Sequence, residues 1–388
     1  MRRWRFFAVL GMTSILLTTC AKTEDTVVPV GTGVAAASWP VFRGDPSLTG
    51  IAQDRIPDRL DLLWSYDTGA LIISSPVVGY GRVYIGSTNG RVYALELADG
   101  RMAWEVDTGD DIEASPLLWD DAVYIGSLSG YLFALDAHTG DVLWTFETDN
   151  SIYGSANWAR MPDSRAVNIF VGSYDNRLYC LDAATGELRW KVETDNYING
   201  APATDGQVVI FGGCDEILHA VSAEDGSEQA EVWAGSYIPG SAALKDGRAY
   251  VGHYDNKLIC VDIRQQKVLW EYEDREDGGP FFASPAVGQD RVVIGSRDEF
   301  LHCVDRESGE RIWKFRTRHE IDGSPVIAGG KVVFGSIDGR LYVVSLEDGR
   351  QLWSYEIGAA ILGCPAVAGG FVIIGAEDGR VYAFGGRS

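Results

Sequence analysis

Cysteine and histidine are the side chains of this 388-residue sequence that could most directly bind a metal or attack a substrate. The six cysteines are widely spaced, and they form neither a zinc-binding pattern nor a C-x-x-C-H haem attachment site. Cys180, Cys260 and Cys303 share one column of a repeat, which small residues such as Ala94 and Ala134 fill elsewhere. Because a column of small apolar residues is a packing position, we expect these thiols to be buried and unreactive.

His219 and His302 also share a repeat column, in this case with the rings of Tyr93, Phe133 and Tyr179. The shared column favours a packing role for both imidazoles over metal binding. No serine lies in a nucleophile-elbow sequence, and no glycine-rich turn between a strand and a helix could hold phosphate. The sequence therefore predicts no catalytic residue and no metal site.

The columns belong to a repeat of about 40 residues. Each unit holds a start of small residues, then a hairpin such as VYIGSTNGRVYALE at 83–96, then an outer strand that usually carries a tryptophan. The hairpin turns are Asn89-Gly90, Ser129-Gly130, Asp175-Asn176, Asp215-Glu216, Asp255-Asn256, Asp298-Glu299, Asp338-Gly339 and Asp378-Gly379. Eight units of four strands predict an all-β fold, an eight-bladed β-propeller of four-stranded antiparallel blades.

The ends of the repeat predict how the ring closes. The first tryptophan strand, at 62–67, has no hairpin before it, and the last hairpin, at 371–384, has no tryptophan strand after it. We expect the N-terminal strand to complete the eighth blade, because this pairing removes an open sheet edge. The tryptophan column is also broken once: blade 4 has Ala230 there, and Trp233, three residues later, is expected to fill the place from a shifted position.

The N-terminus, MRRWRFFAVLGMTSILLTTC, has a basic head and an apolar stretch at 6–17. Twelve residues at about 1.5 Å each cannot cross a hydrocarbon layer of roughly 30 Å, so we interpret 1–19 as an export signal peptide. Residues 17–20 resemble a lipobox, which makes Cys20 the candidate lipid attachment site and 20–38 a flexible tether. The alternative is an ordinary cleaved signal. By resemblance to lipoprotein sorting, Ala21 favours the outer membrane, reached from the periplasm.

The composition is strongly acidic, with a net charge of −22. Such a surface repels polyanions, which argues against nucleic acid and anionic lipid as partners. Contact with a membrane is therefore expected through a lipid anchor only.

The stretch ALDAHTGDVLW at 134–144 returns as CLDAATGELRW at 180–190 and as ALELADGRMAW at 94–104. This A-x-D-x-x-T-G-x-x-x-W pattern resembles the docking motif of proteins that bind pyrroloquinoline quinone (PQQ). The opening WPVFRGDPSLTG at 39–50 is similar to the entry segment of PQQ-like repeat proteins. The resemblance spans about 39–388 and implies a PQQ-like β-propeller. Eight blades, a lipobox and N-terminal closure resemble the BamB type of outer-membrane assembly lipoprotein more than the quinoprotein alcohol dehydrogenases.

The resemblance allows two uses of the motif. In the structural one, the indoles are apolar wedges between blades and the Thr-Gly pair forms a turn. The wedge residues are Trp64, Trp104, Trp144, Trp190, Trp270, Trp313 and Trp353. Quinoprotein dehydrogenases, by contrast, carry adjacent paired cysteines and hold calcium on long insertions; this sequence has no Cys-Cys pair and its insertions reach only about six residues. We expect no cofactor and no enzyme, with PQQ plus calcium as the alternative.

Two loop columns on one face of the predicted propeller have no common residue type, so the fold leaves them free for recognition. Aromatic residues gather there in blades 3 to 6, and tyrosine-rich patches are favoured in binding surfaces. The candidate partner-binding residues are Glu113, Tyr153, Tyr174, Tyr197, Tyr237, Tyr254, Phe282 and Arg297. The resemblance implies a non-enzymatic envelope scaffold that docks a protein partner, in the manner of outer-membrane assembly. A quinone-dependent oxidoreductase and a carbohydrate- or peptide-binding module stay open as alternatives.

Overall fold

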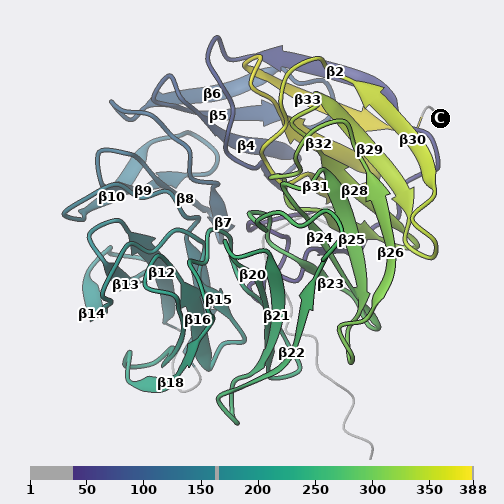
Figure 1. Cartoon of the computed structure of the whole chain (residues 1–388). Coiled ribbons are helices and arrows are strands. Elements are labelled where there is room, and N and C mark those ends of the chain that lie inside the picture. Colours follow the sequence, from purple (N-terminus) through teal and green to yellow (C-terminus); the bar gives the residue numbers. More distant parts are fainter. Residues whose placement is uncertain (1–37, 162–165, 387–388) are drawn as a thin grey trace, which may run out of the picture.

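The structure is a computed structural model that describes residues 38–161 and 166–386. In this part of the chain the strands form eight antiparallel sheets arranged as a ring (Figure 1). Seven sheets have four strands, and blade 7 gains a fifth, β1 (Ile51–Ala52), parallel to its inner strand. The predicted eight-bladed propeller is thus confirmed. The predicted signal peptide, Cys20 and nearly all of the tether lie outside the described residues.

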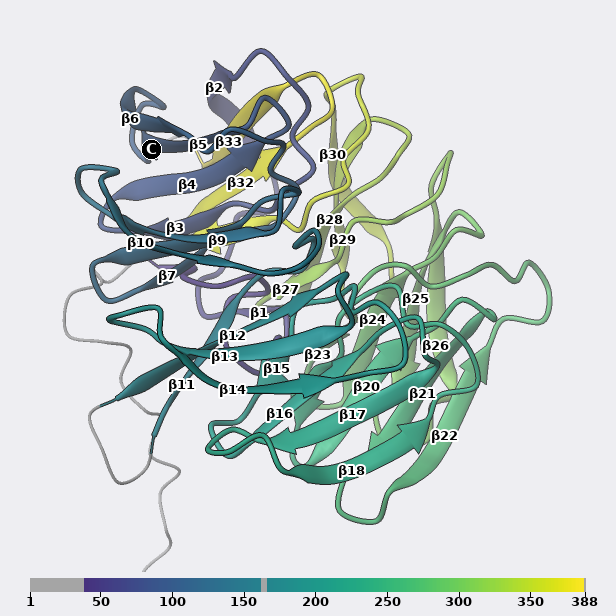
Figure 2. The same ribbon diagram turned by 90° about the vertical axis from the view of Figure 1, so that its left-hand side faces the viewer.

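In blades 1 to 7 the strands run from the channel outward in chain order, whereas the outermost strand of blade 8 is the N-terminal one. Consecutive blades follow one another around the ring (Figure 2). Blade 1 consists of β3 (Val77–Gly79), β4 (Arg82–Ser87), β5 (Arg91–Glu96) and β6 (Met102–Asp107), and blade 2 of β7 (Leu117–Trp119), β8 (Ala122–Gly126), β9 (Tyr131–Asp136) and β10 (Val142–Glu147). Blade 3 consists of β11 (Asn157–Arg160), β12 (Val167–Ser173), β13 (Arg177–Asp182) and β14 (Leu188–Glu193), and blade 4 of β15 (Ala203–Thr204), β16 (Val208–Gly212), β17 (Ile217–Ser222) and β18 (Glu228–Trp233).

Blade 5 consists of β19 (Ala243–Lys245), β20 (Arg248–Gly252), β21 (Lys257–Asp262) and β22 (Lys267–Glu273), and blade 6 of β23 (Ala286–Val287), β24 (Arg291–Gly295), β25 (Phe300–Asp305) and β26 (Arg311–Arg316). Blade 7 consists of β27 (Val326–Ala328), β28 (Lys331–Gly335), β29 (Arg340–Ser345) and β30 (Gln351–Glu356), and blade 8 of β31 (Ala366–Ala368), β32 (Phe371–Gly375), β33 (Arg380–Gly385) and β2 (Asp61–Asp67). The last pairing, with Trp64 opposite Ala383, confirms closure by the N-terminal strand.

Burial follows the position of each strand in its blade. The middle strands are buried on both faces, as in the run from Val209 to Gly212, whereas the outermost strands alternate between buried and exposed residues. Neighbouring blades interlock through the predicted isoleucine column. Ile112 of the loop that enters blade 2 is fully buried against Gly86 of blade 1, where an added Cβ would lie 2.1 Å from the Ile112 side chain. Such contacts repeat around the ring and join the sheets into one body.

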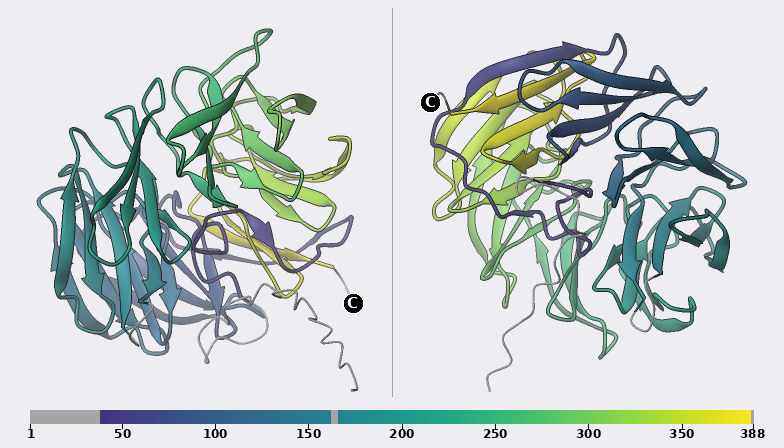
Figure 3. Two further views of the ribbon diagram at one scale, coloured as in Figure 1. Left: turned by 90° about the horizontal axis from the view of Figure 1, so that it is seen from below. Right: turned by 180° about the vertical axis from the view of Figure 1, so that it is seen from behind.

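The entry segment, residues 39–54, closes one end of the central channel and contacts the blades in chain order (Figure 3). Trp39 pairs with Val78 of blade 1. The amides of Leu118, Thr204, Leu244, Val287 and Ile327 then donate to the carbonyls of Pro40, Pro46, Ser47, Thr49 and Gly50. The side-chain amide of Asn157 reaches the Pro46 carbonyl at 2.7 Å, and Asp54 accepts a bond from the Gly369 amide at 2.6 Å. One turn of chain therefore fastens all eight blades.

Arg43 anchors this segment from inside the channel, where its side chain is fully buried. Its guanidinium donates to the Pro325 carbonyl at 2.6 Å and to the Pro285 carbonyl at 2.7 Å. Burial lowers the pKa of the guanidinium. Gly50 must lack a side chain because an added Cβ would lie 2.2 Å from the Arg43 guanidinium. In the described part of the chain, no helix is long and apolar enough to span a membrane.

Candidate functional site

Two sets of loops meet on the end of the ring opposite the entry segment, which we call the upper face. One set enters each inner strand and the other forms each hairpin turn. Backbone bonds tie them together in every blade: the amides of Thr88, Leu128, Tyr174, Cys214, Tyr254, Arg297, Ile337 and Glu377 donate to the carbonyls of Leu71, Asp111, Ser151, Tyr197, Tyr237, Pro280, Glu320 and Ala360. The two unconstrained sequence columns therefore lie side by side.

The first of these columns surrounds the mouth of the channel, a depression of about 180 Å³. Its walls include Tyr153, Asn199, Pro239 and Phe282, and Phe42 of the entry segment lies at its base. Below the rim, serine hydroxyls accept bonds from the preceding blade, as when the Ser284 hydroxyl accepts the Ser241 amide at 3.0 Å. Larger side chains would break this close ring, which explains the small residues at each strand start.

Three candidate tyrosines form a continuous stack on blades 3 and 4. The ring centroids of Tyr153 and Tyr174 are 4.4 Å apart, and Tyr174 lies 4.8 Å from Tyr197 with nearly parallel planes. Tyr197 is 44% exposed, while the other two are half-buried against each other. Burial raises the pKa of Tyr174 to about 12, so its hydroxyl stays protonated at neutral pH.

A second cluster follows on blades 5 to 7. The rings of Tyr254 and Phe282 meet edge to face at 5.8 Å, and the Arg297 guanidinium lies 3.5 Å from the centroid of Phe282. Two Arg297 nitrogens bind the Asp322 carboxylate, at 2.9 and 2.7 Å, which raises the pKa of Arg297. Asp322 was not among the predicted residues, although its column was. The role of Asp322 depends on its pairing with Arg297 of the neighbouring blade, and the residue types in a column do not reveal such a pairing.

Tyr237 lies on the loop between these clusters and is 47% exposed, and Tyr254 beside it is 53% exposed. The aromatic arc, which we define as Tyr153, Tyr174, Tyr197, Tyr237, Tyr254 and Phe282, thus runs along four consecutive blades of the upper face. Of the predicted residues, Arg297 joins the arc at its far end. Glu113, on blade 2, precedes it at the near end.

The tryptophan columns lie elsewhere, at the outer rim between blades. In six interfaces the indole N–H donates to a carbonyl of the next blade at 2.9–3.1 Å, from Trp64, Trp104, Trp144, Trp190, Trp270 and Trp313. Each ring also packs on the glycine of the next D-x-x-T-G type turn; an added Cβ on Gly186 would lie 2.7 Å from Trp144. Trp353 packs instead near Phe384, with centroids 5.8 Å apart.

Blade 4 corrects one expectation, because Trp233 does not fill the place of the missing indole. Trp233 is 69% exposed, and its N–H lies 3.4 Å from the Glu216 carboxylate. At the empty wedge position, small Ala230 is buried and the facing turn has Gln266 instead of glycine. Gln266 donates to the Gln229 carbonyl at 3.3 Å. Wedge and glycine are therefore lost together, and the longer glutamine side chain bridges the two blades.

The cysteine and histidine expectations agree with the packing. Cys180, Cys260 and Cys303 are fully buried, and burial raises the pKa of the Cys260 thiol to about 11. His219 and His302 take the place of tyrosines whose hydroxyls donate to the turn aspartate, as Tyr179 does to Asp175 at 2.6 Å. In the same way His219 lies 2.7 Å from Asp215, and His302 lies 3.0 Å from Asp298.

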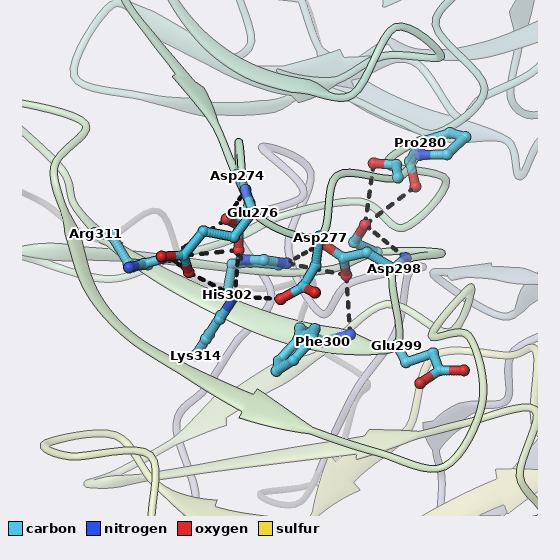
Figure 4. Close-up of polar contacts among 12 residues, drawn as sticks. Asp274, Glu276, Asp277, Pro280, Asp298, Glu299, Phe300, His302, Arg311 and Lys314 are labelled. Carbon is cyan, nitrogen blue, oxygen red and sulfur yellow. Dashed lines mark hydrogen bonds and ion pairs between the residues drawn. The ribbon is translucent and has the colours of Figure 1, made fainter.

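Around His302, however, acidic groups gather in a way that the sequence did not indicate (Figure 4). Asp274, Asp298 and His302 bring possible ligand atoms together, as do Asp274, Glu276 and Asp277. Lys314 already occupies the second group: its Nζ lies 2.8 Å from Asp274 and 2.7 Å from Asp277. Burial opposes ionisation of Asp274, but the Lys314 bond and nearby charges outweigh it and lower the pKa of Asp274. The protein's own ammonium thus serves as the counter-ion.

The residues present do not fit calcium and PQQ at the channel mouth. Calcium requires several carboxylate or carbonyl oxygens around one point. The residues that line this depression include no acidic side chain, and of the two carboxylates in the surrounding column, Glu113 and Asp322, the second is bound to Arg297. The acidic groups near Asp274 are already paired with the protein's own cations, Lys314 and Arg311. The D-x-x-T-G type turns face the neighbouring blade at the rim: Asp182 accepts the amides of Ala184 and Thr185 at 2.9 and 3.0 Å. The docking motif therefore works as a structural joint here.

Comparison with solved structures supports the fold. BamB from Moraxella catarrhalis is 22% identical, with a TM-score of 0.69 over 85% of this chain and 98% of that chain. The quinohemoprotein alcohol dehydrogenase of Comamonas testosteroni is 16% identical, with a TM-score of 0.75 over 90% of this chain and 81% of that chain. A europium-containing methanol dehydrogenase is 15% identical, with a TM-score of 0.74 over 90% and 98%. These likenesses establish the propeller alone.

A search of curated protein sequences finds no match. A family model does match, in overlapping segments at 58–167, 158–279, 215–320 and 273–388, which together span most of the propeller. The match confirms the resemblance that the repeats and the entry segment indicated. The chain belongs to the family described as "Outer membrane protein assembly factor BamB".

Proposed function

We propose that this protein is a non-enzymatic scaffold of the cell envelope that docks a protein partner on its upper face, in the service of outer-membrane protein assembly. The aromatic arc carries the proposal. Tyr153, Tyr174 and Tyr254 lie in the two columns that the fold leaves free. The arc residues belong to the upper-face loops of four consecutive blades, and their rings meet in two groups, Tyr153–Tyr174–Tyr197 and Tyr254–Phe282. Rigid, exposed tyrosines provide contact area at a small cost in conformational entropy, which suits a docking surface.

Two further observations support this function over oxidoreductase chemistry. The family model that matches is named for assembly. The residues that line the channel mouth include no cluster of carboxylates of the kind that would hold calcium beside a quinone. For location, the proposal is export to the periplasm with a lipid on Cys20, in keeping with the lipobox-like sequence.

Site-specific photo-crosslinking in intact cells tests the docking. A benzophenone amino acid replaces Tyr197 or Tyr254 on the arc, or Tyr80 in a turn of the opposite face as the matched control. We expect a discrete crosslinked protein from the two arc positions and none from Tyr80. Equal crosslinking from both faces, or none from the arc, would contradict the proposal. Mass spectrometry of the crosslinked peptide identifies both the partner and the residue it presents.

A further inference from the structure

Arg297 and Lys314 each lie between a carboxylate and an aromatic ring. Arg297 lies over Phe282 at 3.5 Å and binds Asp322 at 2.7 Å. Lys314 lies over Phe300 at 4.3 Å and binds Asp274 at 2.8 Å. In each, the ring face and the carboxylate attract the same positive charge from two sides, which is favourable where water is partly excluded. The chain supplies all three components at both places.

At the near end of the aromatic arc the same components occur without a cation. Glu113 stands in the channel-mouth column, as Phe282 and Asp322 do, and it is half-buried. Among the described residues, it has neither a hydrogen-bond nor an ion-pair partner. Its charge acts on the adjacent rings, since it adds to burial in raising the pKa of both Tyr153 and Tyr174. A carboxylate is therefore held beside a tyrosine stack with nothing to neutralise it.

The position before the hairpin turn explains the missing charge. In blade 6 it holds Arg297, which reaches Asp322 on the next blade. Glu113 is on blade 2, so the corresponding position lies on blade 1, where it holds half-buried Thr88, which carries no charge to neutralise Glu113. Burial and nearby Asp111 raise the pKa of Glu113, so the fold alone disfavours its ionised form. A cation from outside would relieve this penalty and complete the arrangement that blade 6 completes internally.

We propose that Glu113, Tyr153 and Tyr174 form a receptor for the guanidinium of an arginine side chain that the partner protein presents. Arginine fits better than lysine because its planar, weakly hydrated group can stack on a ring and bind a carboxylate at once, as Arg297 does. The net charge of −22 favours approach of a basic segment. The source of the arginine rests on the proposed function; the receptor itself rests on the geometry.

The receptor is tested with a small probe, independently of any partner. 3-Fluorotyrosine is placed at position 153, and its ¹⁹F resonance is followed while N-acetyl-arginine methylamide is added. We expect a saturable shift, none with the neutral citrulline analogue, and binding at least about threefold weaker in Glu113→Gln. Glu377→Gln, which changes a carboxylate in another upper-face column, is the matched control and should bind as the parent does. Equal shifts with arginine and citrulline, or equal affinity in Glu113→Gln, would overturn the receptor.

The source of the arginine is tested by adding Glu113→Arg to the chain that carries the crosslinker at Tyr197. We expect the crosslinked product to fall at least about tenfold, because the new charge repels a partner arginine. An unchanged yield would refute the assignment to a partner arginine while leaving arc docking intact. If neither arc position crosslinks in the parent, the proposed function fails and the partner assignment with it. The receptor is then decided by the ¹⁹F titration alone.

Discussion

Replacing Trp313 with alanine should measure how strongly the tryptophan joint holds two blades together. The indole is 8% exposed, and its N–H donates to the Leu346 carbonyl at 3.0 Å. Truncating a large buried aromatic side chain costs about 3–5 kcal/mol of unfolding free energy. The Leu346 carbonyl stays paired after the indole is removed, because the Arg291 guanidinium also donates to it. We therefore expect a loss of about 3–5 kcal/mol in Trp313→Ala.

Trp233→Ala is the matched control, because it removes the same side chain from the same kind of outer strand. Trp233 is 69% exposed and makes one long contact with Glu216, so its loss should change stability by about 0.5 kcal/mol or less. Urea unfolding followed by circular dichroism gives both values. If the midpoints of the two variants shift equally, or if Trp313→Ala unfolds as the parent does, the wedge interpretation is wrong.

A double-mutant cycle with Gly349 makes this test more specific. An added Cβ at Gly349 would lie 2.7 Å from the Trp313 ring, and the residue has a positive φ of 71°. Gly349→Ala should therefore be destabilising both through the clash and through backbone strain. The clash disappears once Trp313 is alanine, whereas the strain remains, so the double variant should lose less than the sum of the single losses. Strict additivity would mean that ring and glycine do not touch.

The remaining predictions concern the anchor, closure, the cofactor and one charge. Cys20→Ser should move the protein from the membrane fraction to the soluble fraction; a wild type that is already soluble would contradict lipidation. Deleting residues 60–68 removes β2, so we expect loss of most of the cooperative thermal transition, and an unchanged transition would contradict closure by this strand. Isothermal titration should find no saturable PQQ binding at micromolar concentrations with or without calcium, and one tight site per chain would restore the quinoprotein alternative. Because burial and Asp111 raise the pKa of Glu113, folding disfavours its ionised form above that pKa. Glu113→Gln should accordingly be at least as stable as the parent at pH 7, with the difference vanishing below pH 4; a less stable variant at pH 7 would show that the carboxylate has a structural partner.

Much of the fold was predictable because the repeat presents the same local physics eight times. Tight turns, alternating strands and the isoleucine column each recur in register, so a single ambiguous unit is corrected by its neighbours. Closure by β2 followed from the incomplete units at the two ends. The path of the entry segment did not, because it occurs once and its bonds use backbone carbonyls, which every sequence possesses. The fully buried Arg43 gave no sequence signal either, since arginine is ordinarily exposed.

The candidate site was likewise predictable where it depends on repeated columns and not where it depends on individual contacts. Listing the unconstrained columns predicted which residues face the upper side, but not which of them touch. The Arg297–Asp322 pair and the Lys314–Asp274 pair both join adjacent blades, and such pairings depend on strand register and loop length at each interface. The prediction for Trp233 was wrong for the same reason: its spacing suggested a shifted wedge, whereas Gln266 on the next blade takes the place of the wedge. Compensation between neighbouring repeats is invisible when each column is read separately.

At blade 4 the wedge tryptophan and the glycine of the facing turn are both absent, and this joint loss bears on function as well as on stability. If the D-x-x-T-G type turns served a cofactor, an altered turn would not require the tryptophan of the preceding blade to change. Here the glycine and the indole disappear at one interface, and a glutamine amide takes over the contact. That coupling is what a mechanical joint demands, because each ring fits only above a residue without a side chain. The residues of the motif that suggests quinone chemistry are thus determined by packing between blades. The freedom to recognise a partner lies in the upper-face columns that packing does not constrain.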